Sequence, residues 1–235
     1  MIAICFLTYG DPPERQEYAE ATLRSLHLLH AEEDVWLHLA DDGTPDQGYR
    51  DRLLAIARET FGERTSVSNS EHRGYGGNYN LAMQTTHNLA DIILPLEDDW
   101  RVVREFDLTP VVEVLRRQVF RCVRMGYIGF TDRLQAHFVS AGNLYWLELD
   151  PDSPERHVFT GGPRLEHVDF ERELGLWPEQ MDQGTTEQAV CDRPQARQGV
   201  AWPIHFIHPS GDLFAHIGSM KADTGHAVVA AGVAG

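Results

Sequence analysis

The segment Ile92-Ile93-Leu94-Pro95-Leu96-Glu97-Asp98-Asp99-Trp100 decides how the rest of the chain is interpreted. Its apolar part, residues 92–96, is typical of a buried strand. Three carboxylates follow at the place where an open α/β sheet binds ligands, outside the carboxyl ends of its strands. Adjacent carboxylates repel one another unless a cation lies among them, and Mg²⁺ or Mn²⁺ with phosphate-bearing substrates is the natural partner. The alternative is a solvated acidic turn after an ordinary strand.

Strand and helix patterns alternate through the first 100 residues. Apolar runs bounded by turn residues predict strands, and apolar residues spaced three or four apart predict helices. The expected strands are 2–8, 35–39, 66–68 and 91–96, and the expected helices are 14–30, 49–61 and 80–89. Strands that alternate with helices over short connections predict an α/β fold with a mainly parallel sheet flanked by helices.

The order of elements changes after Trp100. We expect helices over Leu108–Arg124, Phe170–Leu176 and Thr185–Asp192, and strands over Gly126–Phe130, Phe138–Leu149 and Trp202–Ile207. The tail 227–235 is small and featureless, so we expect it to be frayed. With 235 residues in all, the sequence predicts a single domain over residues 1–226.

Composition narrows the classes of partner. The net charge of −16 opposes non-specific binding to nucleic acid or to an anionic membrane. No apolar run approaches the roughly 20 residues of a membrane span, and Met1–Phe6 begins directly as a strand without the features of a signal peptide. The three widely spaced cysteines indicate reduced thiols. We therefore expect a cytoplasmic protein.

Four segments carry a resemblance to a known family. They are Phe6–Gly10, Ala40–Asp46, Arg73–Asn80 and Glu97–Asp99, in this order. With them the chain resembles the nucleotide-sugar glycosyltransferases of the GT-A fold, in particular family 2. The resemblance implies a Rossmann-like GT-A domain, with a nucleotide-sugar-binding half over 1–100 and a smaller acceptor half over 101–226. Two departures are Thr8, where the family usually has Pro, and Glu97, where its metal motif begins with Asp.

The resemblance implies roles for particular residues around the donor. Asp99 is expected to bind Mn²⁺ or Mg²⁺ directly, with His216 as a second ligand and His205 and His208 as alternates. Asp42 has a competing interpretation as a turn residue beside Gly43, and Arg73 has one as a surface arginine paired with Glu71. The glycines after Arg73 would let the backbone pass close to a ligand. The expected donor-binding residues are Thr8, Tyr9, Asp42, Arg73, Gly74, Asn78, Glu97 and Asp98.

The acceptor side needs a base that takes the proton of the acceptor hydroxyl. Glu187 fits best, in the first turn of a helix that Thr185 would cap, and Glu179 and Asp182 are rivals. The alternative role of Glu187 is to complement the helix dipole. Gly161 and Gly162 are expected to flank the acceptor, with Trp177 as a face for sugar stacking. Trp146 and Trp202 are further stacking candidates, although burial in the core is the commoner fate of a tryptophan.

A cluster of arginines follows the acidic triplet, at Arg101, Arg104, Arg116, Arg117, Arg121 and Arg124. On one helix, Arg117, Arg121 and Arg124 would share a face. That face could receive a polyanionic acceptor, even a modified DNA base, or it could be a solvated surface paired with nearby acids.

The sequence thus predicts a metal-dependent, inverting glycosyltransferase of the hexosyltransferase type, using a UDP-sugar. Its acceptor is unidentified and could be a small molecule, glycan, protein or polyanion. A nucleotidyltransferase acting on sugar phosphates is an alternative, although the loop Thr8–Pro13 has one glycine and no basic residue before Arg15. A non-catalytic nucleotide-sugar-binding module is another.

Overall fold

A computed structural model describes residues 1–125, 133–141, 144–155, 161–203 and 213–218. The expected strand Gly126–Phe130, the tail 227–235 and the alternative ligands His205 and His208 lie outside these ranges. None of the helices in the described ranges is long and apolar enough to cross a membrane. The three cysteines are buried and form no disulfide.

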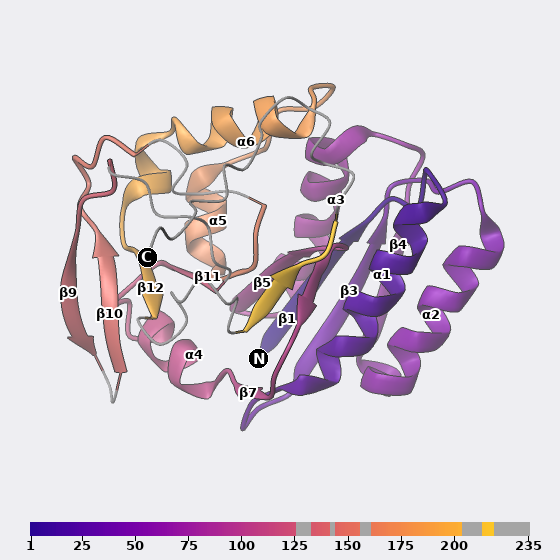
Figure 1. The fold of residues 1–235 in the computed structure, drawn as a ribbon, viewed down its shortest axis with the longest axis horizontal. Helices are drawn as coiled ribbons and strands as arrows, with labels where there is room; N and C mark the ends of the chain where they lie inside the picture. The colour runs from indigo at the N-terminus through magenta and orange to yellow at the C-terminus, as the bar shows by residue number, and fades with distance from the viewer. Residues whose placement is uncertain (126–132, 142–143, 156–160, 204–212, 219–235) are drawn as a thin grey trace, which may run out of the picture.

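The first half forms four parallel strands with helices between them (Figure 1), as the alternating pattern predicts. Their order in the sheet is β4-β3-β1-β5. The strands are β1 (Ile2–Thr8), β3 (Val35–Asp41), β4 (Thr65–Asn69) and β5 (Ile92–Glu97), and the helices are α1 (Glu14–Ser25), α2 (Gln47–Phe61) and α3 (Gly74–Leu89). Parallel strands end at the same edge, so the loops after β1, β3 and β5 meet there.

Within the described residues, the second half extends the same sheet to nine strands, with β11, β8, β12, β10 and β9 following β5 in that order. Only β11 and β10 run against the direction of the other seven, so the sheet is mainly parallel. These strands are β8 (Cys122–Arg124), β9 (Ala136–Ala141), β10 (Leu144–Leu149), β11 (Arg164–His167) and β12 (Val200–Pro203). The helices are α4 (Thr109–Arg116), α5 (Val168–Leu174) and α6 (Gln183–Cys191).

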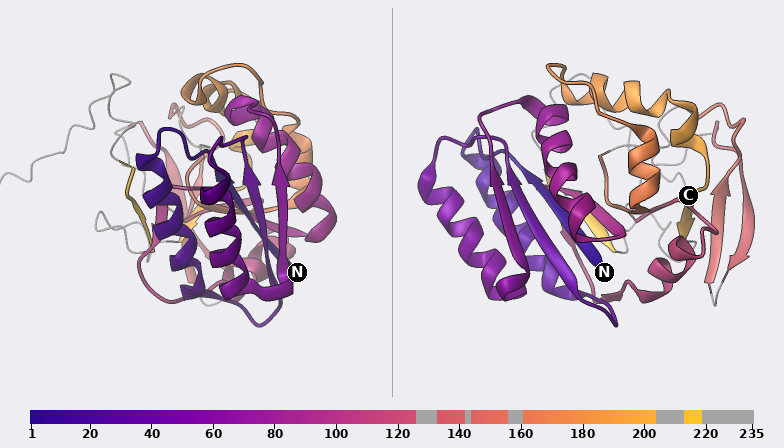
Figure 2. Two further views of the ribbon diagram at one scale, coloured as in Figure 1. Left: turned by 90° about the vertical axis from the view of Figure 1, so that its right-hand side faces the viewer. Right: turned by 180° about the vertical axis from the view of Figure 1, so that it is seen from behind.

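Helices cover both faces of the sheet (Figures 1 and 2). Alternate residues of β1 point to opposite faces: Ile4 and Phe6 pack with α1, α2 and α4, whereas Cys5 and Leu7 pack with α3, α5 and α6. Two small ribbons complete the fold, β2 (Leu29–His30) with β7 (Phe106–Asp107) and β6 (Trp100–Val102) with β13 (Phe214–His216). The second ribbon brings the end of the described chain back to the acidic triplet.

The predicted helix over Leu108–Arg124 is wrong beyond Arg116. Gln118 has a positive φ of 55°, which ends the helix, and residues 122–124 form a strand. The arginines therefore do not share a helical face. Arg116 pairs with Glu33 and Asp91, Arg121 pairs with Glu173, and Arg124 is only 1% exposed.

Two further boundaries differ from the sequence prediction. The segment Phe138–Leu149 is an antiparallel pair, β9 and β10, instead of one strand. Helix α3 begins at Gly74, so the glycine-rich segment is its first two turns and not a loop.

Buried His38 on β3 makes the stability of the fold depend on pH. Its two ring nitrogens contact the hydroxyls of Ser66 and Ser68 on β4, and burial lowers its pKa from 6.5 to about 4. A histidine with a lowered folded pKa contributes stability above its unfolded pKa and loses it as the pH falls through the folded pKa. Relative to His38→Gln, the free energy of unfolding of the wild type should fall by about 3 kcal/mol between pH 6.5 and pH 4. Urea unfolding of both proteins across this range measures the difference, and parallel pH curves would contradict it.

Candidate functional site

A cleft of about 380 Å³ opens at the carboxyl ends of β1, β3 and β5. Seven of the residues predicted to bind the donor line it: Thr8, Tyr9, Asp42, Gly74, Asn78, Glu97 and Asp98. Seven other residues, to which the sequence assigned no site role, also line it: Leu7, Asp11, Pro12, Arg15, His72, Tyr75 and Gln183.

Asp98 is fixed on one wall of the cleft by neutral and charged donors. Its carboxylate accepts hydrogen bonds from the Thr8 hydroxyl (3.0 Å) and the Tyr9 amide (3.3 Å), and it forms a 2.6 Å ion pair with Arg15. Burial lowers the pKa of Arg15, but the carboxylates of residues 97–99 outweigh burial and raise it overall. Asp98 is 2% exposed, so its orientation is set before any ligand arrives.

Asp42 is held beside the same Thr8–Tyr9 segment, because its amide donates to the Thr8 carbonyl (2.9 Å). It accepts a hydrogen bond from the Arg73 amide (2.8 Å), and its other oxygen lies 2.9 Å from Nδ1 of His72. The His72 ring stacks on Tyr9 with 4.4 Å between centroids. Burial raises the pKa of Asp42, although the Arg73 amide and His72 act against burial.

The turn beside Gly43 depends on Asp41 and not on Asp42. The Asp41 carboxylate accepts hydrogen bonds from both the amide and the hydroxyl of Thr44. Gly43 has a φ of 77°, and a Cβ there would lie 2.6 Å from the His72 amide nitrogen. Only glycine therefore lets the His72 segment pack against this turn, and Asp42 stays directed toward the cleft.

Arg73 contributes its backbone and not its side chain. Its amide binds Asp42, but its side chain is exposed and does not line the cleft. Among the described residues that line the cleft, Arg15 is the one with a fixed positive charge. Arg15 lies in the first turn of α1, directly after the loop that follows β1. This position in the sequence could have indicated that Arg15 reaches the ligand site at the end of β1.

Helix α3 carries Asn78 into the cleft through close packing at its glycines. A Cβ on Gly76 would lie 1.9 Å from the carbonyl oxygen of Pro178, so this helix face admits no side chain there. The glycine allows a helix–backbone contact and not the approach of a ligand. Asn78 donates to the Ala40 carbonyl (3.2 Å), and its buried Oδ1 has no hydrogen-bond partner within the described ranges. Because Asn78 lines the cleft, that oxygen is placed to accept a hydrogen bond from a ligand.

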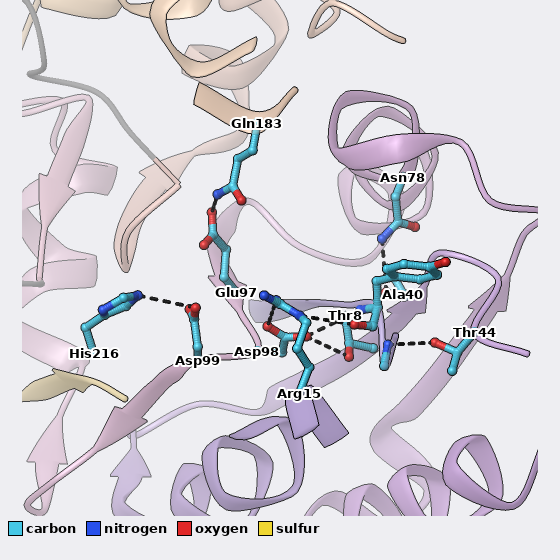
Figure 3. A network of polar contacts seen from close by, with 12 residues as sticks. Thr8, Arg15, Ala40, Thr44, Asn78, Glu97, Asp98, Asp99, Gln183 and His216 are labelled. Carbon is cyan, nitrogen blue, oxygen red and sulfur yellow. Dashed lines mark hydrogen bonds and ion pairs between the residues drawn. The ribbon is translucent and has the colours of Figure 1, made fainter. Parts of the chain in front are cut away.

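Asp99 faces away from Asp98 and toward His216 (Figure 3). Register in the β6–β13 ribbon places His216 opposite Trp100, and the Ile217 amide donates to the Asp99 carbonyl (2.8 Å). Oδ2 of Asp99 lies 3.3 Å from Nε2 of His216. Asp99 is fully buried, and a Cβ on Gly218 would come within 2.4 Å of the same Oδ2.

This pair fits a divalent cation. A carboxylate oxygen and an imidazole nitrogen lie 3.3 Å apart here, and these two side chains would hold Mn²⁺ or Mg²⁺. Within the described ranges no three His, Cys, Asp or Glu side chains converge on one point. Neither Asp99 nor His216 lines the cleft, and the pair adjoins it through Glu97 and Asp98, which do.

Glu187 lies near Glu97 and is half-buried. It accepts hydrogen bonds from the Gly161 amide (3.1 Å) and from Nε2 of Gln183 (3.0 Å). Asp182, not Thr185, caps α6, so Glu187 lies in the second turn and not the first. The rivals already have partners, because Asp182 accepts from Thr185 and Glu179 accepts from Asn80.

The predicted role of Trp177 at the acceptor site is wrong, because its side chain lies in the core. It is 2% exposed, it donates from Nε1 to Glu171, and it packs on Tyr79 at 4.2 Å between centroids. Its ring therefore has no free face for a sugar. Trp146 and Trp202 are buried as well, whereas Gly161 and Gly162 lie beside Glu187 as a buried turn.

Comparison with known proteins gives structural matches only. No protein-family model and no curated protein matches the sequence. The S. aureus TarS fragment 1–349 in complex with UDP superposes with a TM-score of 0.65 at 12% identity, covering 91% of this chain and 59% of that one. The mannosyltransferase PcManGT from Pyrobaculum calidifontis, in complex with GDP-Man and Mn²⁺, superposes with a TM-score of 0.52 at 13% sequence identity. The match covers 86% of this chain and 56% of that one.

GalNAc-T7 with UDP, GalNAc and Mn²⁺ gives a TM-score of 0.58 at 11% identity, covering 86% of this chain and 42% of that chain. This chain thus spans about 59% of the length of the TarS fragment and less of the other two. All three are glycosyltransferases with a GT-A domain. The chain therefore has the GT-A fold of nucleotide-sugar glycosyltransferases.

Proposed function

We propose that this protein is a metal-dependent, inverting glycosyltransferase that moves a sugar from a UDP-sugar to an acceptor hydroxyl. The observation that carries the proposal is the Asp99–His216 pair at the end of the strand whose preceding acids, Glu97 and Asp98, line the cleft. The cleft volume of about 380 Å³ falls within the range of small-molecule sites. Structures with the same fold bind UDP, or GDP-Man with Mn²⁺.

The donor is assigned to residues of the first half. Asp42, Tyr9 and His72 form the polar and aromatic side that suits the base and ribose, and Asn78 offers its unpartnered oxygen beside them. Arg15, whose Nε donates to the Tyr9 carbonyl (3.2 Å), supplies positive charge for the diphosphate. The remaining donor contacts come from Thr8, Gly74, Glu97 and Asp98.

Asp99 and His216 would hold Mn²⁺ or Mg²⁺ in this enzyme. When bound, the ion neutralises the charge that builds on the departing nucleotide diphosphate. Burial of Asp99 strengthens its attraction to a cation, because the surrounding dielectric is low.

Glu187 is assigned the role of base on the acceptor side, together with Gly161 and Gly162. In an inverting transfer, the acceptor oxygen attacks the anomeric carbon as the nucleotide leaves from the opposite face. A carboxylate beside that oxygen takes its proton. The Gly161 amide and Gln183 orient Glu187 for this purpose. A polyanionic acceptor loses part of its support, because Arg116 and Arg121 are paired with acids and Arg124 is buried.

Hydrolysis of UDP-sugars in the presence of Mn²⁺ tests the proposal. The wild type should release UDP and free sugar slowly without an acceptor, and Asp99→Ala should not. A binding module would bind the nucleotide without turnover, and a nucleotidyltransferase would instead form sugar nucleotide from sugar phosphate and UTP. Absence of metal-dependent turnover for every sugar nucleotide would refute the proposed function.

Replacing Arg15 should weaken UDP binding far more than replacing Arg73. Arg15→Gln removes the charge that faces the cleft, and charge-assisted hydrogen bonds to phosphate contribute about 1.5–3 kcal/mol, or about 10- to 100-fold in Kd. Arg73→Gln is the matched control, because that side chain is exposed and its amide remains in place. Calorimetric titration with UDP and Mn²⁺ compares them. A larger loss at Arg73 would show that the diphosphate lies elsewhere.

A further inference from the structure

Gln183 joins two carboxylates that come from opposite halves of the chain. It is the first residue of α6, and its Nε2 donates to Oε1 of Glu97 (2.7 Å) and to Oε1 of Glu187 (3.0 Å). Figure 3 shows its amide directed at the carboxylate of Glu97. Gln183 lines the cleft, and its hydrogen bond holds Glu187 next to the lining residue Glu97.

The two carboxylates lie within a few ångströms of each other. A Cβ on Gly161 would come 1.8 Å from Oε1 of Glu97 and 2.7 Å from Oε1 of Glu187. Residue 161 must therefore be a glycine, because any side chain there would collide with the two carboxylates. The amide of Gly161 donates to Glu187. Tyr75 closes the cluster, because the same Cβ would come 2.5 Å from its hydroxyl.

Two acids this close repel each other unless a donor lies between them. The amide group of Gln183 carries two hydrogens, one for each carboxylate. The reverse orientation would point the amide oxygen at both acids, so the chemistry itself assigns the nitrogen to this position. Gln183 thus offsets the repulsion and fixes the direction of both side chains.

We propose that Gln183 is a positioning residue that holds Glu187 at the donor cleft in the orientation needed to take the acceptor's proton. This inference rests on the proposed function, because it gives Glu187 the role of base. The substitution Gln183→Leu removes the bridging donor at similar size, and Gln183→Glu removes it at nearly the same shape. Glu187 is then free to turn away from Glu97.

The chain offers a matched control on the same helix. Gln188 donates from Nε2 to Oδ1 of Asp192 (2.8 Å), with the same four-residue spacing, but it does not line the cleft. Gln188→Leu removes an equivalent hydrogen bond without touching Glu97 or Glu187. Its turnover should match that of the wild type.

The test is a double-mutant cycle on Mn²⁺-dependent hydrolysis of a UDP-sugar by the full chain. Gln183→Leu should lower kcat by about 100-fold, with a smaller change in KM, since misplacement of a catalytic group by about 1 Å has an effect of this size. In a Glu187→Gln background the same substitution should lower kcat no further, because the group it positions is already lost. Gln183→Glu should reproduce this result, and a thermal shift with UDP and Mn²⁺ identifies which variants are folded.

The outcomes separate the inference from the function on which it rests. If the wild type and Gln188→Leu turn over but the folded Gln183 variants match them, Gln183 has no positioning role. If the losses from Gln183→Leu and Glu187→Gln multiply, Gln183 acts independently of Glu187 and the inference is wrong. If the wild type hydrolyses no UDP-sugar, the proposed function fails and the inference fails with it.

Discussion

Asp99→Asn is expected to lower kcat/KM for the UDP-sugar donor by about 1,000-fold at a fixed Mn²⁺ concentration. The carboxylate is fully buried and faces His216, so it provides the charged half of the proposed metal pair. Asparagine keeps the shape that Gly218 packs against but removes the charge. Lewis-acid stabilisation of a leaving group amounts to several kcal/mol, and about 4 kcal/mol corresponds to this loss.

The variant Asp98→Asn separates an effect on metal binding from an effect on donor binding. Asp98 is held by Thr8, Tyr9 and Arg15 and does not face His216. Its substitution should weaken donor binding while the concentration of Mn²⁺ needed for half-maximal activity changes little. A titration of activity with Mn²⁺ distinguishes the two variants, with the exposed Asp107→Asn as a control for surface charge. An unchanged Mn²⁺ dependence in Asp99→Asn would show that the metal binds elsewhere.

Glu187→Gln should lower kcat for transfer and hydrolysis by about 100- to 1,000-fold and leave UDP affinity nearly unchanged. Glutamine still accepts the hydrogen bond of the Gly161 amide but cannot take a proton, and general base catalysis contributes this order of magnitude. Steady-state hydrolysis with Mn²⁺ gives kcat, and calorimetry gives the affinity for UDP. A loss of affinity without a loss of kcat would assign Glu187 to donor binding.

The two rival carboxylates provide controls for Glu187. Asp182→Asn keeps a residue that caps helices well, and Glu179→Gln keeps an acceptor for Asn80. Both variants should retain kcat within a few-fold of the wild type. If either fell as far as Glu187→Gln, the base would have to be reassigned.

Local patterns were enough to predict the donor half of the sheet. Strand β1 occupies the predicted residues, and β5 ends where the apolar run meets the acids. The expectation that Asp42 and Asp98 both bind the donor came from the family resemblance. Both line one cleft because the parallel strands β3 and β5 end at a common edge of the sheet.

Errors arose where tertiary packing overrode a local preference. Glycine disfavours helices, so residues 74–77 were predicted as a loop, yet contact with Pro178 requires a glycine inside the helix. Helical spacing of Arg117, Arg121 and Arg124 was coincidental, since the chain turns at Gln118. The indole of Trp177 donates a hydrogen bond to the buried carboxyl of Glu171. The sequence does not show that these two side chains meet.

The missed residues depend on contacts between distant parts of the chain. Arg15 gains its role from Asp98, 83 positions later, and Gln183 gains its role from Glu97, 86 positions earlier. A single sequence contains no record of such pairs. The four-residue spacing of Gln183 and Glu187 on α6 was the one local clue to their contact.

Calorimetric titration of the wild type with UDP, in the presence and absence of Mn²⁺, tests the central claim most directly. We expect UDP to bind in the cleft, Mn²⁺ to tighten this binding at least tenfold, and Asp99→Asn to abolish the gain while leaving the metal-free affinity in place. Binding of UDP with the same affinity with and without Mn²⁺, or no binding at all, would contradict the claim.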